Sequence, residues 1–332
     1  MKPRVITNAI SWETADLEKL NRHDYYLPTE WQELTAENAA DFSAVAYHFG
    51  AMLADSLKVP VGLICNAVGG ATAEAFVDRR TLEFHPHLVD ILYNWRQNDM
   101  VQDWVRQRST QNIANSKNPL QRHPYEPCYL YESGIAPLSC YAVRGAIWYQ
   151  GEGDASQTLA PMYAKLLKNV MDQWKEDYMS PDMYVGVVQL TSYGTDEEDA
   201  WGIVRTQQEK MAVEDGRGAF CVTYDVGEPD NIHPIEKRTV GYRLADQILV
   251  KAYGKDIDAA YAEIAEVKAE NGAITLKVTQ PLVANDDAKG FQVLADGKWS
   301  WAAAKADVDS VTICVEKAEA VRYAYTTWTD AN

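Results

Sequence analysis

The sequence lacks an excess of positive charge, a long apolar run and any close pair of cysteines. Of its 332 residues, 31 are Lys or Arg and 48 are Asp or Glu, which gives a net charge of −17. Nucleic-acid binding depends on Lys and Arg that neutralise phosphate, so this balance argues against a nucleic-acid partner. No stretch approaches the roughly 20 apolar residues of a membrane-spanning helix, so we expect no membrane partner.

The five cysteines are widely spaced, and no Cys-x-x-Cys pair occurs. We therefore expect no metal site and no disulfide framework. We also expect no cofactor, since the Gly-rich segment at 66–72 lacks the Lys and Ser/Thr of a phosphate-binding loop. The first residues, MKPRVITNAISWE, lack the apolar core of a signal peptide. The sequence leaves the compartment unknown.

From about residue 41 to residue 253, predicted strands alternate with predicted helices. Apolar runs predict strands at 59–65, 143–149, 183–190 and 219–224. Amphipathic segments predict helices at 41–57, 161–175, 203–213 and 234–253, with Asp41 capping the first and Pro234 opening the last. Near-continuous apolar strands indicate a parallel sheet covered by helices on both faces. Ligands of such sheets bind beyond the carboxyl ends of the strands.

The pattern changes after residue 256. Short alternating or β-branched runs predict strands at 274–278, 291–295, 311–315 and 321–325. The dipeptides Asn271-Gly272 and Asp296-Gly297 are typical of hairpin turns. We therefore predict an α/β domain over residues 1–256 and a small antiparallel β domain over residues 257–332.

Two of the polar segments that follow predicted strands contain paired or closely spaced glycines. Gly69-Gly70 turns from a strand toward a helix, where backbone N–H groups favour an anion or oxyanion. The alternative is an ordinary tight turn. The second segment carries Gln150, Glu152 and Asp154 among two glycines, and it predicts a substrate-binding site. A solvated loop is the alternative.

A third polar segment, Asp230-Asn231-Ile232-His233-Pro234, lies between a predicted strand and a predicted helix. An Asp three residues before a His can hold its Nδ1–H and orient the other ring nitrogen as a general base. This spacing alone is a weak signal, because it often arises by chance. Its position in line with the two glycine-containing segments favours the catalytic interpretation.

These segments resemble the sialate O-acetylesterase group of SGNH/GDSL-type hydrolases. The matching stretches occur in family order and are DFSAVAYHFG (41–50), VPVGLICNAVGGATAEAF (59–76), YESGIAPL (131–138), AIWYQGEGDA (146–155), VVQL (187–190), VRTQQ (204–208) and NIHPIEKRTVGYRLA (231–245). The resemblance implies a three-layer α/β/α, flavodoxin-like fold with a C-terminal β appendage. It also implies a carboxylic ester hydrolase that removes O-acetyl groups from sugars such as sialic acid, and its relatives are often secreted or periplasmic.

The resemblance further implies roles for individual residues. His233 matches the family's general base, and Gly70 matches an oxyanion donor. Arg205 and Gln208 match positions near the site, with Arg205 the candidate contact for an acidic sugar. Asp230 has the generic spacing of the acid partner. Many relatives carry their Asp two residues before the His, where this chain has Asn231, so Asp225 is an alternative acid.

Two departures from the family pattern bear on activity. Asp154 stands where relatives usually place an Asn that donates to the oxyanion, and a carboxylate donates only when it is protonated. The nucleophile segment Gly-x-Ser-Asn does not occur in the 332 residues, nor does Gly-x-Ser-x-Gly. Ser43 fits a structural position on the first helix. Ser133 is a weak substitute, because no strand-to-helix turn surrounds it.

Three hypotheses follow from these observations. The first is an O-acetylesterase whose nucleophile comes from an N-terminal segment or a second chain, because loss of the central nucleophile strand would expose the edges of its neighbours. Truncation at both ends of the sequence would fit this view. The second is an inactive relative that retains the cleft as a sugar-binding module. The third is a structural or interaction protein, which only the acidity and the β appendage support.

Overall fold

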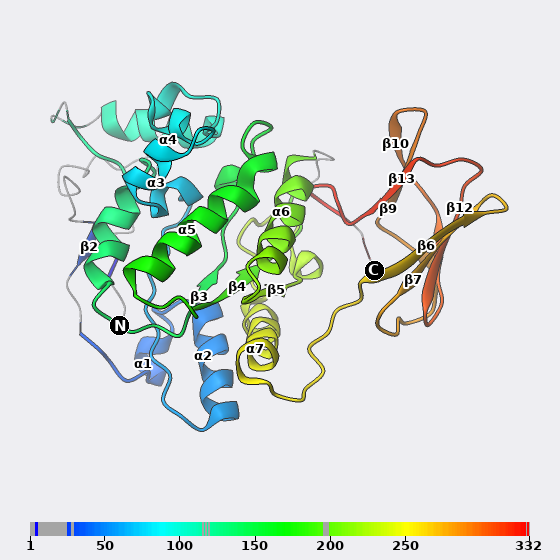
Figure 1. Cartoon of the computed structure of the whole chain (residues 1–332), viewed down its shortest axis with the longest axis horizontal. Helices are drawn as coiled ribbons and strands as arrows, with labels where there is room; N and C mark the ends of the chain where they lie inside the picture. Colours follow the sequence, from blue (N-terminus) through cyan, green and yellow to red (C-terminus); the bar gives the residue numbers. More distant parts are fainter. Residues whose placement is uncertain are drawn as a thin grey trace. The chain divides into compact units, whose positions relative to one another are not determined.

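The computed structural model describes residues 4–5, 25–27, 30–114, 116, 118, 120–194, 199–329 and 331 (Figure 1). The chain divides into two compact units, each made of three segments. The first unit comprises Met1–Leu190, Ile203–Cys221 and Lys237–Lys255. The second comprises Thr191–Gly202, Val222–Glu236 and Asp256–Asn332, so the C-terminal β strands share their unit with two segments from earlier in the chain.

The first unit contains α-helices and a parallel sheet. Its α-helices are α1 (Ala36–Ala39), α2 (Ala44–Leu57), α3 (Arg79–Phe84), α4 (Asp103–Ala114), α5 (Tyr163–Asp177), α6 (Ala200–Glu214, of which Ile203 onward belongs here) and α7 (Lys237–Tyr253). Its strands are β1 (Arg4–Val5), β2 (Tyr26–Leu27), β3 (Gly145–Trp148), β4 (Tyr184–Val188) and β5 (Gly218–Cys221). β1 and β2 form a separate antiparallel pair.

The central sheet of this unit is parallel, with the order β3-β4-β5. Every residue of β5 and four of the five residues of β4 are buried, as the apolar runs predicted. Figure 1 shows α5 and α6 on one side of the strands and α2 and α7 on the other. The predicted three-layer α/β/α fold is confirmed.

Close packing at two glycines fixes the layer formed by α2 and α7. A Cβ at Gly186 of β4 would lie 2.9 Å from a methyl carbon of Leu244, so α7 packs directly on the sheet. A Cβ at Gly241 would lie 2.6 Å from the Cβ of His48 and 2.9 Å from the carbonyl oxygen of Val45. The absence of a side chain at Gly241 thus lets α2 approach α7 closely.

The predicted strand at 59–65 is wrong. This segment is described, but it forms no strand, and Val61, Leu63 and Cys65 are only half-buried. β3 is an edge of the sheet, and no strand pairs with its outer side in the described residues. A strand requires a ladder of hydrogen bonds to a neighbouring strand, so apolar composition alone does not make one.

Local sequence signals placed the helices to within a few residues. The predicted segments 161–175 and 203–213 became α5 and α6. The predicted caps were wrong in two cases. Ser43, and not Asp41, caps α2 by accepting from the Ala46 N–H at 3.2 Å. α7 begins at Lys237, three residues after Pro234.

The second unit contains two antiparallel sheets, as the alternating runs predicted. One has the order β6-β7-β12-β11-β8 and the other β10-β9-β13. The strands are β6 (Ile264–Glu270), β7 (Ala273–Val278), β8 (Asn285–Ala288), β9 (Phe291–Ala295), β10 (Lys298–Trp301), β11 (Ala304–Ala306), β12 (Ser310–Cys314) and β13 (Ala320–Tyr323). Their inward residues form a core that includes Ile274, Leu276, Phe291, Val293 and Ile313.

The two hairpin predictions are confirmed. Asn271-Gly272 joins β6 to β7 and Asp296-Gly297 joins β9 to β10. All four residues have positive φ, between +49° and +74°. This is the geometry that two-residue turns require to match the twist of the paired strands.

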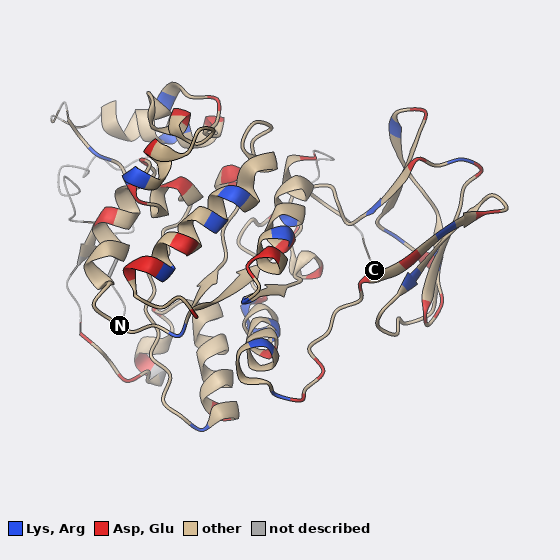
Figure 2. Ribbon diagram, in the orientation of Figure 1, with Lys and Arg blue, Asp and Glu red and all other residues tan. Residues whose placement is uncertain are grey.

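Acidic and basic side chains are interleaved along the surface helices, as Figure 2 shows for α5 and α6. The opposite charges pair locally on α5, where Lys168 contacts Asp172. None of the helices in the described part of the chain combines the length and apolarity that a bilayer crossing requires.

Candidate active site

The first predicted segment forms a tight turn at Gly69-Gly70. Gly70 has a φ of +76°, which favours glycine, and a Cβ there would lie 2.4 Å from the Tyr125 hydroxyl and 3.0 Å from the Trp104 ring. The Tyr125 hydroxyl also donates to the Gly69 carbonyl at 2.9 Å. Within the described residues the backbone N–H of Gly70 donates to no acceptor, which leaves it available to a ligand oxygen.

Gln150 connects the loop after β3 to this turn. Its Nε2 donates to the Ala71 carbonyl at 3.0 Å and to the Asp154 carboxylate. Its Oε1 accepts from the Tyr163 hydroxyl at 2.9 Å. Both ends of the amide are therefore bound inside the protein, and two segments far apart in the sequence are brought together.

Asp154 makes a second connection between the same segments. It is fully buried, and its Oδ2 accepts from the backbone N–H of Ala73 at 3.1 Å. Burial raises the pKa of Asp154 to about 6, although the hydrogen bond from Gln150 opposes this shift. The carboxylate acts as an acceptor toward the turn that carries Gly70.

Glu152 begins the short 3-10 turn η8 (Glu152–Asp154). Burial raises the pKa of Glu152, and the positive charge of Lys237 opposes this shift. The Lys237 ammonium also lies 5.2 Å from the centre of the Tyr149 ring. The start of α7 thus places a positive charge beside the loop that follows β3.

Arg205 and Gln208 lie on α6 and face the ends of the strands. Gln208 is fully buried; it accepts from the Leu190 N–H at 2.9 Å and donates to the Gln150 carbonyl at 2.8 Å. Arg205 is 4% exposed, and its Nε donates to the Leu190 carbonyl at 2.8 Å. Burial lowers the pKa of Arg205 to about 9. Both side chains hold the backbone at the end of β4.

His233 and Asp230 lie in the second unit, on the loop between β5 and α7. The loop is organised around Glu228, whose carboxylate accepts from the Asn231 amide at 3.1 Å and from the Ile235 N–H at 2.6 Å. The His233 N–H donates to Asn231 Oδ1 at 3.0 Å. The His233 side chain is exposed.

The acid partner of His233 stays a prediction. Asp230 is exposed, and no hydrogen bond or ion pair joins it to His233 in this described loop. Asp225, the alternative, is also exposed and lies in the 3-10 turn η10 (Tyr224–Val226). Asn231 occupies the position two residues before the histidine, and its amide oxygen accepts a hydrogen bond from the His233 backbone N–H.

The two serines considered from the sequence have local structural roles. Ser43 caps α2, as already noted. Ser133 is buried in a π-helical turn (Tyr131–Ile135), and its hydroxyl donates to the Tyr129 carbonyl at 2.8 Å. Neither stands on the strand-to-helix turn that a serine nucleophile needs.

Sequence reasoning missed Glu74, which lies fully buried in the 3-10 turn η3 (Ala73–Phe76) beside Asp154. The available signal was a single carboxylate inside the otherwise small or apolar stretch 73–77. Sequence reasoning also missed Trp104 and Tyr125, two aromatic residues that cover Gly70 although they lie far from it in the sequence. No local pattern identifies such contacts.

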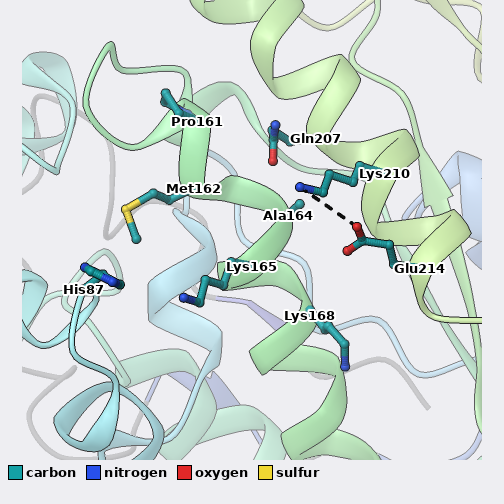
Figure 3. Close-up of a pocket in the computed structure, with 9 residues that line it drawn as sticks. All are labelled: His87, Pro161, Met162, Ala164, Lys165, Lys168, Gln207, Lys210 and Glu214. Carbon is teal, nitrogen blue, oxygen red and sulfur yellow. Dashed lines mark ion pairs between the residues drawn. The ribbon is translucent and has the colours of Figure 1, made fainter.

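A separate hollow of about 480 Å³ lies on the outer side of α5 and α6 (Figure 3). His87, Lys165 and Lys210 line it, together with Pro161, Met162, Ala164, Lys168, Gln207 and Glu214. Lys210 pairs with Glu214 at 4.0 Å. The lining contains none of the predicted site residues. Among the described residues, no group of three or more His, Cys, Asp or Glu side chains could hold a metal ion.

Comparison with known proteins gives a consistent match. Residues 27–250 match the family described as "carbohydrate esterase, sialic acid-specific acetylesterase". The chain is 26% identical to the sialate O-acetylesterase of Mus musculus over 98% of its own length, and 25% identical to that of Homo sapiens over 90%. It spans only 66% and 60% of those two proteins.

A solved structure gives the same result for the fold. A carbohydrate acetylesterase from Xanthomonas citri superimposes with a TM-score of 0.72 at 27% identity. The match covers 90% of this chain and 63% of that protein.

Proposed function

Since the chain belongs to the carbohydrate esterase family of sialic acid-specific acetylesterases, we propose that it removes O-acetyl groups from sugars by a serine-hydrolase mechanism. The observation that carries the proposal is the joining of the Gly70 turn to the loop after β3 through Gln150 and Asp154. These elements lie within the matched residues, and the free N–H of Gly70 points to an oxyanion donor.

In the proposed reaction a serine hydroxyl attacks the acetyl carbonyl, and His233 takes the hydroxyl proton as general base. The Gly70 N–H stabilises the oxyanion that forms. His233 then returns the proton to the sugar oxygen, which leaves as the alcohol. Water, deprotonated by His233, releases acetate and restores the serine. We assign Asp230 to orienting His233, and Gln150, Glu152, Arg205 and Gln208 to shaping the substrate side.

We further propose that the serine lies on a β-strand that these 332 residues do not supply, from an N-terminal segment or a second chain. The family's Gly-x-Ser-Asn segment does not occur in the sequence. One feature supports an additional strand: the outer edge of β3 pairs with no other strand among the described residues. A strand added at this edge would pair with β3.

The experiment measures acetate release from O-acetylated sialic acid and hydrolysis of p-nitrophenyl acetate. The chain as it stands should show little turnover. The chain extended at its N-terminus by a family segment carrying Gly-x-Ser-Asn should be active, and the same extension with Ser→Ala provides the matched control. His233→Ala in the extended chain should reduce kcat about 10²–10⁴-fold, the usual contribution of a general base.

Two results would count against the proposal. Strong hydrolysis by the chain as it stands would place the nucleophile within it. Calorimetric binding of acetylated sialic acid by an extended chain that releases no acetate would instead indicate an inactive sugar-binding relative.

A further inference from the structure

Glu74 is a buried carboxyl group that no fixed donor satisfies. Its side chain is 0% exposed, and neither carboxylate oxygen receives a hydrogen bond from an N–H or hydroxyl donor of the described residues. A buried, unsatisfied carboxylate is costly enough that such groups take up a proton or find a partner.

The partner within reach is a second buried carboxyl group. Asp154 is also fully buried, and its carboxylate accepts from the N–H of Ala73, the residue next to Glu74. Two carboxyl groups that share one buried site can bond to each other only when a proton lies between them. Packing holds the two segments together, because a Cβ at Gly153 would lie 3.0 Å from the Thr72 methyl group and 3.5 Å from the Ala71 carbonyl oxygen. The carboxyl groups therefore have little room to separate.

We propose that Glu74 and Asp154 share one proton and together position the Gly70 turn against the loop after β3. Glu74 donates its O–H to the Asp154 carboxylate. Asp154 in turn accepts from the Ala73 N–H at 3.1 Å and from the Gln150 amide. Glu74 is thus a positioning residue, which acts on the turn through Asp154.

The electrostatics of the site agree with a single shared proton. Burial raises the pKa of Glu74 well above its usual value, and the charge of Asp154 raises it further. Burial likewise raises the pKa of Asp154. Two carboxylates in one buried site cannot both ionise without strong repulsion. The pair therefore keeps its proton to a higher pH than an ordinary carboxyl group does.

Other titratable groups lie around the pair, but none of them takes the place of the proton that Glu74 and Asp154 share. Glu152 and the Tyr163 hydroxyl both respond to the charge of Asp154, and Lys237 acts on Glu152. The Cys128 N–H donates to the Glu74 carbonyl at 2.9 Å. Burial raises the pKa of the Cys128 thiol to about 12, so this thiol stays neutral. Among the described residues, no neighbouring cation acts to lower the pKa of Glu74 or Asp154.

The infrared spectrum of the protein tests the shared proton directly, without any catalytic assay. At neutral pH the wild-type chain should show the carbonyl stretch of a protonated carboxyl group. Glu74→Gln should lack this band. In Asp154→Asn the band should titrate at a pH lower by about one unit or more, because the neighbouring negative charge is gone. Glu152→Gln is the matched control, and the Glu74–Asp154 band and its titration should persist in it.

Two infrared results would overturn the proposal. One is a wild-type spectrum without a protonated carboxyl group at neutral pH. The other is a band that titrates identically in Asp154→Asn. Neither result depends on the proposed esterase activity, so this proposal and the proposed function can fail separately.

Amide hydrogen exchange tests the positioning role. Gln at position 74 can still donate to Asp154, whereas Ala cannot. The Ala73 amide should therefore remain protected in Glu74→Gln and exchange about tenfold faster or more in Glu74→Ala, as expected when one hydrogen bond to a charged group is lost. Equal protection in the two variants would show that Glu74 does not hold the turn. If Glu74→Ala does not fold, the wild-type and Asp154→Asn spectra still decide the proposal.

Discussion

His123 is fully buried, and each of its ring nitrogens has a fixed partner. Nδ1 accepts from the Tyr125 N–H at 3.0 Å, and Nε2 lies 3.2 Å from Asn112 Oδ1. An amide oxygen only accepts, so Nε2 carries the hydrogen and the ring is neutral. Burial lowers the pKa of His123 to about 3, and the charge of Arg108 contributes. The neighbouring Tyr125 covers Gly70, which connects this histidine to the candidate site.

We predict that His123 makes the protein sensitive to mild acid. Its folded pKa is depressed, so its stabilisation is fully present above the unfolded pKa of about 6.5 and is lost as the pH falls toward the folded value. Within that window the free energy of unfolding should fall by about 1.4 kcal/mol per pH unit. Urea unfolding of the wild type and His123→Gln measures this loss. Parallel pH profiles in the two proteins would contradict the prediction.

The polar side chains of the candidate site act mainly on the backbone. Gln150 binds the Ala71 carbonyl, Gln208 binds both Leu190 and Gln150, and Arg205 binds Leu190. The sequence predicts these residues at a site, because polar groups follow apolar strands. It does not predict that they bind main-chain groups, because their partners lie on other elements.

At the scale of the element, α2 shows how one side chain defines a helix end. Ser43 accepts from the Ala46 N–H, and Lys58 ends the helix with a left-handed φ of +56°. We predict that Ser43→Ala lowers the free energy of unfolding by about 1 kcal/mol, the usual cost of losing an N-cap. Ser43→Asp should restore most of it, since Asp also caps. Thermal and urea unfolding of the three proteins measure the effect.

This pair of variants also separates structural from catalytic roles. In an active, extended chain, Ser43→Ala should leave the rate of acetate release unchanged. A loss of activity without a loss of stability would mean that Ser43 takes part in catalysis.

Segment 59–65 shows why an element cannot be read from its own sequence alone. The run VPVGLIC has the composition of a buried strand. Strand formation also depends on a neighbouring strand that supplies the hydrogen bonds, and the composition of one segment does not provide it. Helix α5 has no such dependence, because its hydrogen bonds lie within the segment.

At the scale of the whole molecule, the C-terminal strands and the His233 loop belong to one unit. The Tyr193 N–H donates to the Thr327 carbonyl at 3.1 Å, and Tyr193 bridges to Glu228. The Tyr224 and Tyr323 hydroxyls are 2.8 Å apart. The C-terminal region therefore supports the loop that carries the candidate general base.

We predict that deletion of residues 257–332 loosens the His233 loop. The truncated chain loses Tyr323 and Thr327 as partners, so residues 222–236 should exchange their amide hydrogens at least about tenfold faster, the effect of losing about 1.4 kcal/mol of local stability. Exchange in β4 serves as the internal control for the retained core. Equal exchange in residues 222–236 before and after truncation would contradict the prediction.

The amino-acid sequence by itself determined the α/β class, the helices α5 and α6, the two hairpins and the family. These depend on local periodicity, turn chemistry and short motifs, each of which is complete within a few residues. Gly70 and His233 were selected in the same way, from their neighbours along the chain, and their catalytic roles stay predictions.

Only the tertiary structure decided which polar groups meet. It bound the buried Asp154 carboxylate to the N–H of Ala73, next to Glu74, and closed Tyr125 and Trp104 over Gly70. It also combined 222–236 with the C-terminal strands in one unit. Each of these contacts joins residues far apart in the sequence, and burial then sets their protonation, which local sequence patterns do not encode.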